Sequence, residues 1–162
     1  MLFQPAVAGT DSITQALAGA AALVPAVAAA LADQRTNRVP NALVALAIVP
    51  TLVAVRLADH PAHLLTSLAL GVGAMALPLL VVHLVAPAAM GFGDVKLAVA
   101  LGAGLGVLEP TLAVLALAIA SGLTLLVAAC SRRSAMPFAP GLVLGATAAM
   151  ALGAFKGWSV PT

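Results

Sequence analysis

Six long apolar runs follow one another along the chain, separated by short segments that hold most of its polar residues. The runs lie at about residues 13–32, 42–58, 62–86, 95–108, 111–130 and 140–158. They are rich in Ala, Leu and Val and lack the alternation of apolar and polar residues that is typical of half-buried strands. Most are close to the roughly 17–25 residues that a helix needs to cross a bilayer. Because a backbone in lipid must satisfy its own hydrogen bonds, the pattern predicts an all-α bundle of six transmembrane helices.

The run at 95–108 is shorter than the others, with about 14 residues between Asp94 and Glu109. We therefore expect this helix to start below the membrane surface or to be widened by its neighbours. Small residues recur in several runs, and such residues let helices approach closely in a membrane. The glycines that predict this close packing are Gly71, Gly73, Gly102, Gly104, Gly106, Gly141 and Gly145.

The composition agrees with a membrane protein. Charged residues make up 7% of the 162 residues, and the mean hydropathy is +1.16, whereas a soluble domain carries about 25% charged residues. The length suits one domain, residues 1–162, embedded in a lipid bilayer. The small, scattered net charge of +2 excludes nucleic acid as a partner. Cys130 is the sole cysteine, which excludes an internal disulfide and a cysteine-built zinc site.

The basic residues predict the orientation of the bundle. Five of the seven lie in or beside the connections after the first, third and fifth runs: Arg35, Arg38, Lys96, Arg132 and Arg133. Short loops rich in Lys and Arg stay on the cytoplasmic side of a membrane. We therefore expect a multi-pass protein of the plasma membrane with both termini on the outer side.

The chain has five acidic residues, and two of them fall on the predicted cytoplasmic face. Asp11, Asp59 and Glu109 lie at predicted outer ends of runs, where a helix cap or a solvated turn explains them. Asp33 ends the first run and Asp94 precedes the fourth, both on the cytoplasmic side. Two close carboxyl groups cannot both ionise easily, so the pKa of one rises and the pair shares a proton. Such a pair can activate water and protonate a leaving group, as an aspartic protease does.

Simpler explanations compete with this catalytic interpretation. Asp94 could cap the fourth helix, and Asp33 could pair with a neighbouring arginine at the surface. Gly91 and Gly93 favour catalysis, because they remove side chains beside Asp94 and leave room for a peptide backbone. No metal or other cofactor is expected, since His83 is the only histidine deep within a run, and His60 and His63 lie on the predicted outer side.

Three short segments stand at predicted cytoplasmic ends of helices: DQRTNRVPN at 33–41, GFGDVKLAVALG at 91–102 and MPFAPGLVLGA at 136–146. In this order they resemble motifs of the type IV prepilin peptidases and the related archaeal preflagellin peptidases. The first resembles an aspartate followed by basic residues and Val-Pro-Asn, and the second the GxGD motif with its Val-Lys-Leu. The third is similar to the Pro-Phe-x-Pro start of the last helix. The resemblance covers about residues 13–158.

The resemblance implies a function. Asp33 and Asp94 match the family's catalytic aspartates, and the implied activity is removal of a short basic leader from a pilin-like precursor at the cytoplasmic face. The cut typically follows a Gly, just before an apolar helix. Larger members carry an insert with paired CxxC motifs that is associated with N-methylation. Here the first connection has only about ten residues, so we expect the peptidase without the methyltransferase. This compact form is most similar to the enzymes of Flp/Tad-type pili.

Three further residues have less specific assignments. Pro40 and Asn41 are expected to end the first loop and start the second helix, with Asn41 bonding loop backbone. Lys96 could hold an ionised carboxylate, contact substrate, or simply reach the membrane interface.

The alternative function is that of a non-enzymatic six-helix protein, such as a small transporter or a pilus assembly factor. Few polar residues lie within the runs, which disfavours a transporter. The sequence leaves the oligomeric state open.

Overall fold

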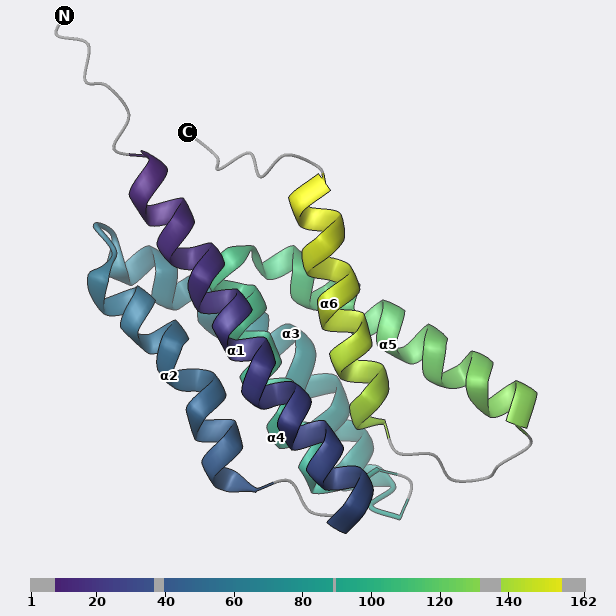
Figure 1. The fold of residues 1–162 in the computed structure, drawn as a ribbon. Coiled ribbons are helices and arrows are strands. Elements are labelled where there is room, and N and C mark those ends of the chain that lie inside the picture. Colours follow the sequence, from purple (N-terminus) through teal and green to yellow (C-terminus); the bar gives the residue numbers. More distant parts are fainter. Residues whose placement is uncertain (1–7, 37–39, 89, 132–137, 156–162) are drawn as a thin grey trace, which may run out of the picture.

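The computed structural model describes residues 8–36, 40–88, 90–131 and 138–155, and within them it has six helices and no strand. The helices are α1 (Ala8–Thr36), α2 (Asn41–Leu57), α3 (Pro61–Val85), α4 (Phe92–Leu108), α5 (Pro110–Ser131) and α6 (Ala139–Phe155) (Figure 1). The predicted all-α fold is therefore confirmed, with one helix for each apolar run. The start of the fourth helix differs from the start of the predicted run at residue 95. Helix α4 begins at Phe92 and so includes Asp94 in its first turn.

Helix α4 is the centre of the bundle. It contacts each of the other helices, and from Asp94 to Leu108 all of its residues are buried except Lys96 and Val99, which are half-buried. A helix that is surrounded by protein can be shorter than one that must span the lipid by itself. This position explains why the fourth apolar run is short.

Helices α3 and α4 pack backbone against backbone. A Cβ atom on Gly71 would overlap the carbonyl oxygen of Gly102 and lie 2.5 Å from the Cα atom of Gly106. A Cβ atom on Gly102 would in turn lie 2.7 Å from the carbonyl oxygen of Gly71. The close packing predicted for these glycines is confirmed. Gly73 differs, because the nearest atom to its Cβ position is Cδ1 of Leu77 at 3.7 Å, an ordinary contact.

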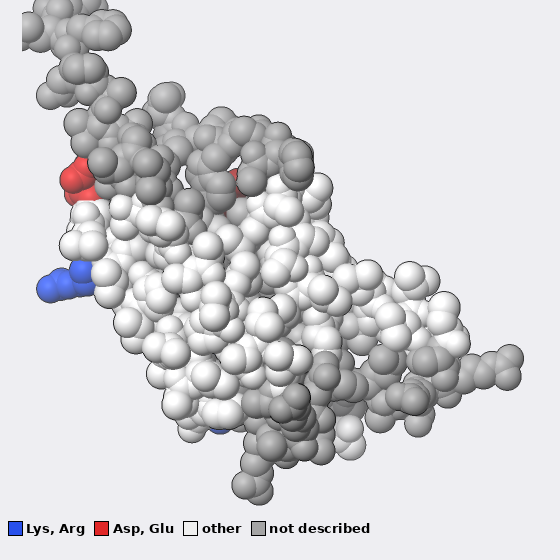
Figure 2. Space-filling model, in the orientation of Figure 1, with Lys and Arg blue, Asp and Glu red and all other residues white. Residues whose placement is uncertain are grey.

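Two of the described helices are long and apolar enough to cross a membrane, α3 over Pro61–Val85 and α5 over Pro110–Cys130. The apolar parts of other helices are shorter, at Leu17–Ala29, Asn41–Leu57 and Ala139–Gly153. Figure 2 shows few charged groups on the described part of this face, in agreement with the many exposed Leu and Val side chains. The six crossings and the position of the termini stay predictions.

The ends of α1, α2, α3 and α4 alternate between the two ends of the bundle. The C-terminal ends of α1 and α3 and the starts of α2 and α4 lie at its lower end in Figure 1, and the turn between α2 and α3 lies at the upper end. Asp33 belongs to the last turn of α1 and Asp94 to the first turn of α4. The chain path therefore brings the two segments that carry these aspartates to the same end.

Candidate active site

Asp94 lies in the first turn of α4 and is not its N-cap residue. The N-cap residue is Gly91, which has φ −72° and ψ 144° and makes no side-chain cap hydrogen bond. The backbone N–H of Asp94 donates to the carbonyl oxygen of Gly91 at 3.1 Å. The interpretation of Asp94 as the N-cap is therefore wrong. Its carboxyl group still lies at the end of the helix where the dipole stabilises a negative charge.

Burial distinguishes Asp94 from Asp59 and Glu109, the other acids whose side chains the structure describes. Its side chain is 6% exposed, whereas Asp59 and Glu109 are exposed in turns. The other buried polar side chain of the described residues is Thr51, whose hydroxyl donates to the carbonyl oxygen of Ile48 at 2.6 Å. Placing a carboxyl group inside an apolar bundle costs free energy. Such a cost is typical of a group that is kept for chemistry.

Gly91 borders the carboxyl group of Asp94. Gly91 is exposed, and its backbone angles are open to any residue. A Cβ atom on it would lie 3.8 Å from Oδ2 of Asp94. The backbone therefore does not demand glycine here, and what glycine provides is free space beside the carboxyl group. Gly93 is the second residue of α4 and is half-buried.

Lys96 connects α4 with the start of α2. Its Nζ donates to Oδ1 of Asn41 at 2.8 Å and lies 5.1 Å from the ring centroid of Phe92. Pro40 is the N-cap of α2, and its carbonyl oxygen accepts from the backbone N–H of Leu43 at 3.1 Å. The prediction that Pro40 and Asn41 begin the second helix is confirmed. The side-chain oxygen of Asn41 accepts the hydrogen bond of Lys96. The loop at 37–39, to whose backbone Asn41 was expected to bond, lies outside the described residues.

Asp33 is the second aspartate of the predicted pair. It lies on α1, which contacts α4, and at the end of the bundle where α4 starts (Figure 1). Its side chain lies outside the described residues. The helices that carry Asp33 and Asp94 are thus in contact, and the ends that hold these residues lie at the same end of the bundle, as a pair requires.

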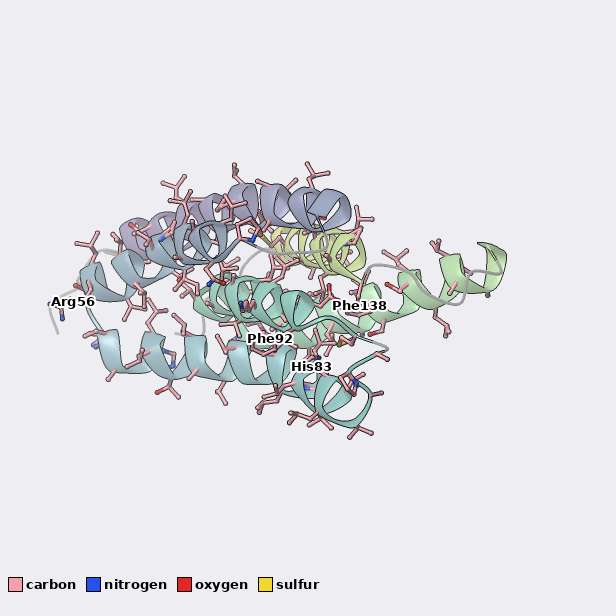
Figure 3. The ribbon with its side chains drawn as sticks, turned by 90° about the horizontal axis from the view of Figure 1, so that it is seen from below. Arg56, His83, Phe92 and Phe138 are labelled. Carbon is pink, nitrogen blue, oxygen red and sulfur yellow. The ribbon has the colours of Figure 1, made fainter. Side chains whose placement is uncertain are left out.

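His83 is a polar residue of this region to which the sequence analysis assigned no role. It lies in the last turn of α3, and its Nδ1 is 2.8 Å from the carbonyl oxygen of Met90. Its ring centroid is 5.4 Å from that of Phe92, and Figure 3 shows the two side chains side by side. The signal in the sequence was its place at the end of an apolar run, only eleven positions before Asp94. No group of three or more His, Cys, Asp or Glu in the described part of the chain could hold a metal ion.

The chain matches one known protein family. Residues 15–129 fit the model of the type IV leader peptidase family. The matched stretch runs from α1 into α5 and contains Asp33, Asp94 and the residues that connect α2 with α4. No curated protein and no solved structure matches the chain.

Proposed function

The chain belongs to the type IV leader peptidase family and is a prepilin peptidase, a hydrolase; we propose that Asp33 and Asp94 form its catalytic pair. The observation that carries this proposal is the burial of Asp94 in the first turn of the central helix, beside the free space at Gly91. A buried carboxyl group with no side chain on the neighbouring Gly91 is what an aspartic peptidase needs if the substrate backbone is to approach it. A cap or a surface ion pair needs neither.

The proposed reaction uses one carboxylate, one carboxylic acid and one water molecule. The carboxylate takes a proton from water while the water oxygen attacks the carbonyl carbon of the scissile bond. The carboxylic acid stabilises the developing negative charge on the carbonyl oxygen and gives its proton to the leaving nitrogen as the C–N bond breaks. The products are the leader with a new carboxylate and the mature chain with a new amino group.

The proposed substrate is a pilin-like precursor, cut at the cytoplasmic face of the plasma membrane. Its short basic leader would lie outside the bilayer, and its apolar helix would lie beside the bundle in the lipid. The support is the family, the two helices long enough to cross a membrane, and the basic residues near the ends of α1 and α5. In this orientation, the end of the bundle that holds the start of α4 faces the cytoplasm.

This function is tested by the product of the reaction. The full chain is placed in lipid vesicles with a tagged precursor in which a basic leader ending in Gly precedes an apolar helix. We expect cleavage directly after that Gly, with no methyl group on the new terminus even when S-adenosylmethionine is added. Mass spectrometry of the terminal peptide reads both results. An uncut precursor, or a cut inside the apolar helix, would contradict the proposal.

Gly91→Val is expected to slow cleavage by about tenfold or more, because its side chain fills the space beside the Asp94 carboxyl group. The thermal unfolding midpoint should stay close to that of the unaltered protein, since residue 91 is exposed and has ordinary backbone angles. Initial cleavage rates and unfolding curves measure the two effects. Gly122→Val is the matched control, because a Cβ atom at Gly122 meets no atom within 4 Å. Unchanged cleavage by Gly91→Val would show that substrate does not use this space.

A further inference from the structure

His83 fixes the residue that precedes the N-cap of α4. A carbonyl oxygen only accepts hydrogen bonds, so the 2.8 Å contact with Met90 requires that Nδ1 of His83 carries a proton and donates it. This bond joins the last turn of α3 to the residue directly before Gly91. The N–H of Nδ1 is present both in this neutral tautomer and in the charged ring, so the bond does not depend on the charge of His83.

His83 also contacts the residue that follows Gly91. Its ring lies 5.4 Å from the ring of Phe92, with 44° between the ring planes. The Phe92 ring has Nζ of Lys96 at 5.1 Å, and Lys96 bonds to Asn41 at the start of α2. A connected set of side chains thus runs from α3 across the first turn of α4 to α2. His83 is its α3 end, and Figure 3 shows it beside Phe92.

The described residues of the connection between α3 and α4 are mostly exposed. Pro87, Ala88 and Gly91 are exposed. Met90 is half-buried against the core, and its carbonyl oxygen is the group that His83 holds. A segment with few buried contacts opens more easily, so a side chain that holds it stabilises its position. His83 supplies that contact on both sides of Gly91, at Met90 and at Phe92.

We infer that His83 is a positioning residue for Asp94. By holding Met90 and Phe92, it fixes the turn from Gly91 to Asp94 and so the direction in which the carboxyl group points. This inference rests on the proposed catalytic role of Asp94. Positioning matters because a displacement of about 1 Å at a reacting group can slow a reaction by about 100-fold.

The test compares His83→Leu with His83→Asn, using full-length protein in lipid vesicles and a tagged pilin-like precursor that the unaltered protein cleaves. His83→Leu keeps bulk but removes the donor, and we expect kcat to fall by about tenfold or more with KM unchanged. The amide nitrogen of Asn occupies nearly the place of Nδ1 and can donate to Met90, so His83→Asn should keep most of the rate. If His83→Leu does not accumulate in the membrane, His83→Gln is measured instead. The amide of Gln lies farther from the backbone than Nδ1, near the position of Nε2, so it does not replace the hydrogen bond to Met90.

Two controls separate this inference from its premise. His63→Leu changes an exposed histidine in the first turn of α3, at the other end of that helix, and should leave kcat unchanged. Asp94→Asn, measured in the same vesicles, tests the catalytic role itself. If Asp94→Asn is inactive while the Leu variant of His83 keeps its full kcat, the positioning role is overturned and the proposed function stands. A second result would also overturn it. If kcat falls equally in His83→Leu and His83→Asn, and in proportion to the fall in their unfolding midpoints, the role of His83 is purely structural.

Discussion

Asp94→Asn is expected to reduce leader cleavage by about 1,000-fold or more, which corresponds to the contribution of a positioned acid or base. Asn has the shape of Asp but can neither take a proton from water nor give one to the leaving nitrogen. The side chain is 6% exposed at the first turn of α4, so bulk water cannot easily replace the lost carboxyl group. Cleavage of a tagged precursor in vesicles, followed over hours, gives the residual rate.

The folded state should tolerate this change. A neutral amide removes the cost of a buried charge, so the unfolding midpoint of Asp94→Asn should be equal to that of the unaltered protein or higher. Asp59→Asn serves as the control, because Asp59 is exposed in the turn between α2 and α3. It should cleave at the normal rate. Normal processing by Asp94→Asn would exclude Asp94 from the reaction.

Gly71→Ala is expected to give the largest loss of stability, about 3 kcal/mol, at the upper end of the usual range for overpacking. Its Cβ atom would lie 2.5 Å from the Cα atom of Gly106 and would overlap the carbonyl oxygen of Gly102. These are backbone atoms, which cannot turn away as a side chain can, so α3 and α4 must separate. Cleavage should fall as well, because α4 carries Asp94.

The matched control lies two residues away on the same helix. Gly73→Ala adds the same methyl group, but the nearest atom is Cδ1 of Leu77 at 3.7 Å. Its unfolding midpoint, measured in the same detergent, should stay close to that of the unaltered protein. Equal stability of the Gly71 and Gly73 variants would contradict the backbone packing of α3 on α4.

The architecture was largely predictable because apolar runs of helix length leave few alternatives. The start of α4 was harder to predict. Glycines are poor helix formers, so GFGD suggested a loop before residue 95, yet α4 begins at Phe92 and includes Gly93. The contacts of α4 with all the other helices stabilise this turn where intrinsic propensity does not. This difference of three residues moves Asp94 from the expected N-cap position into the first turn of α4.

The contacts around the site depend on the tertiary fold and were not predictable from local patterns. Lys96 and Asn41 are 55 positions apart in the sequence and form one hydrogen bond. His83 and Met90 belong to a helix end and a connection, where the run at 62–86 suggested only an apolar helix. Motifs identified the segments that matter, and the packing of α2, α3 and α4 determines which side chains in them meet.

The most direct test of the catalytic pair is the cleavage rate of Asp33→Asn, measured beside Asp94→Asn and the double variant. Asp33 lies on the last turn of α1, at the end of the bundle where α4 starts. If the two aspartates act as one unit, each single variant falls to the same residual rate and the double variant is no slower. Normal cleavage of the precursor by a folded Asp33→Asn protein would contradict the pair.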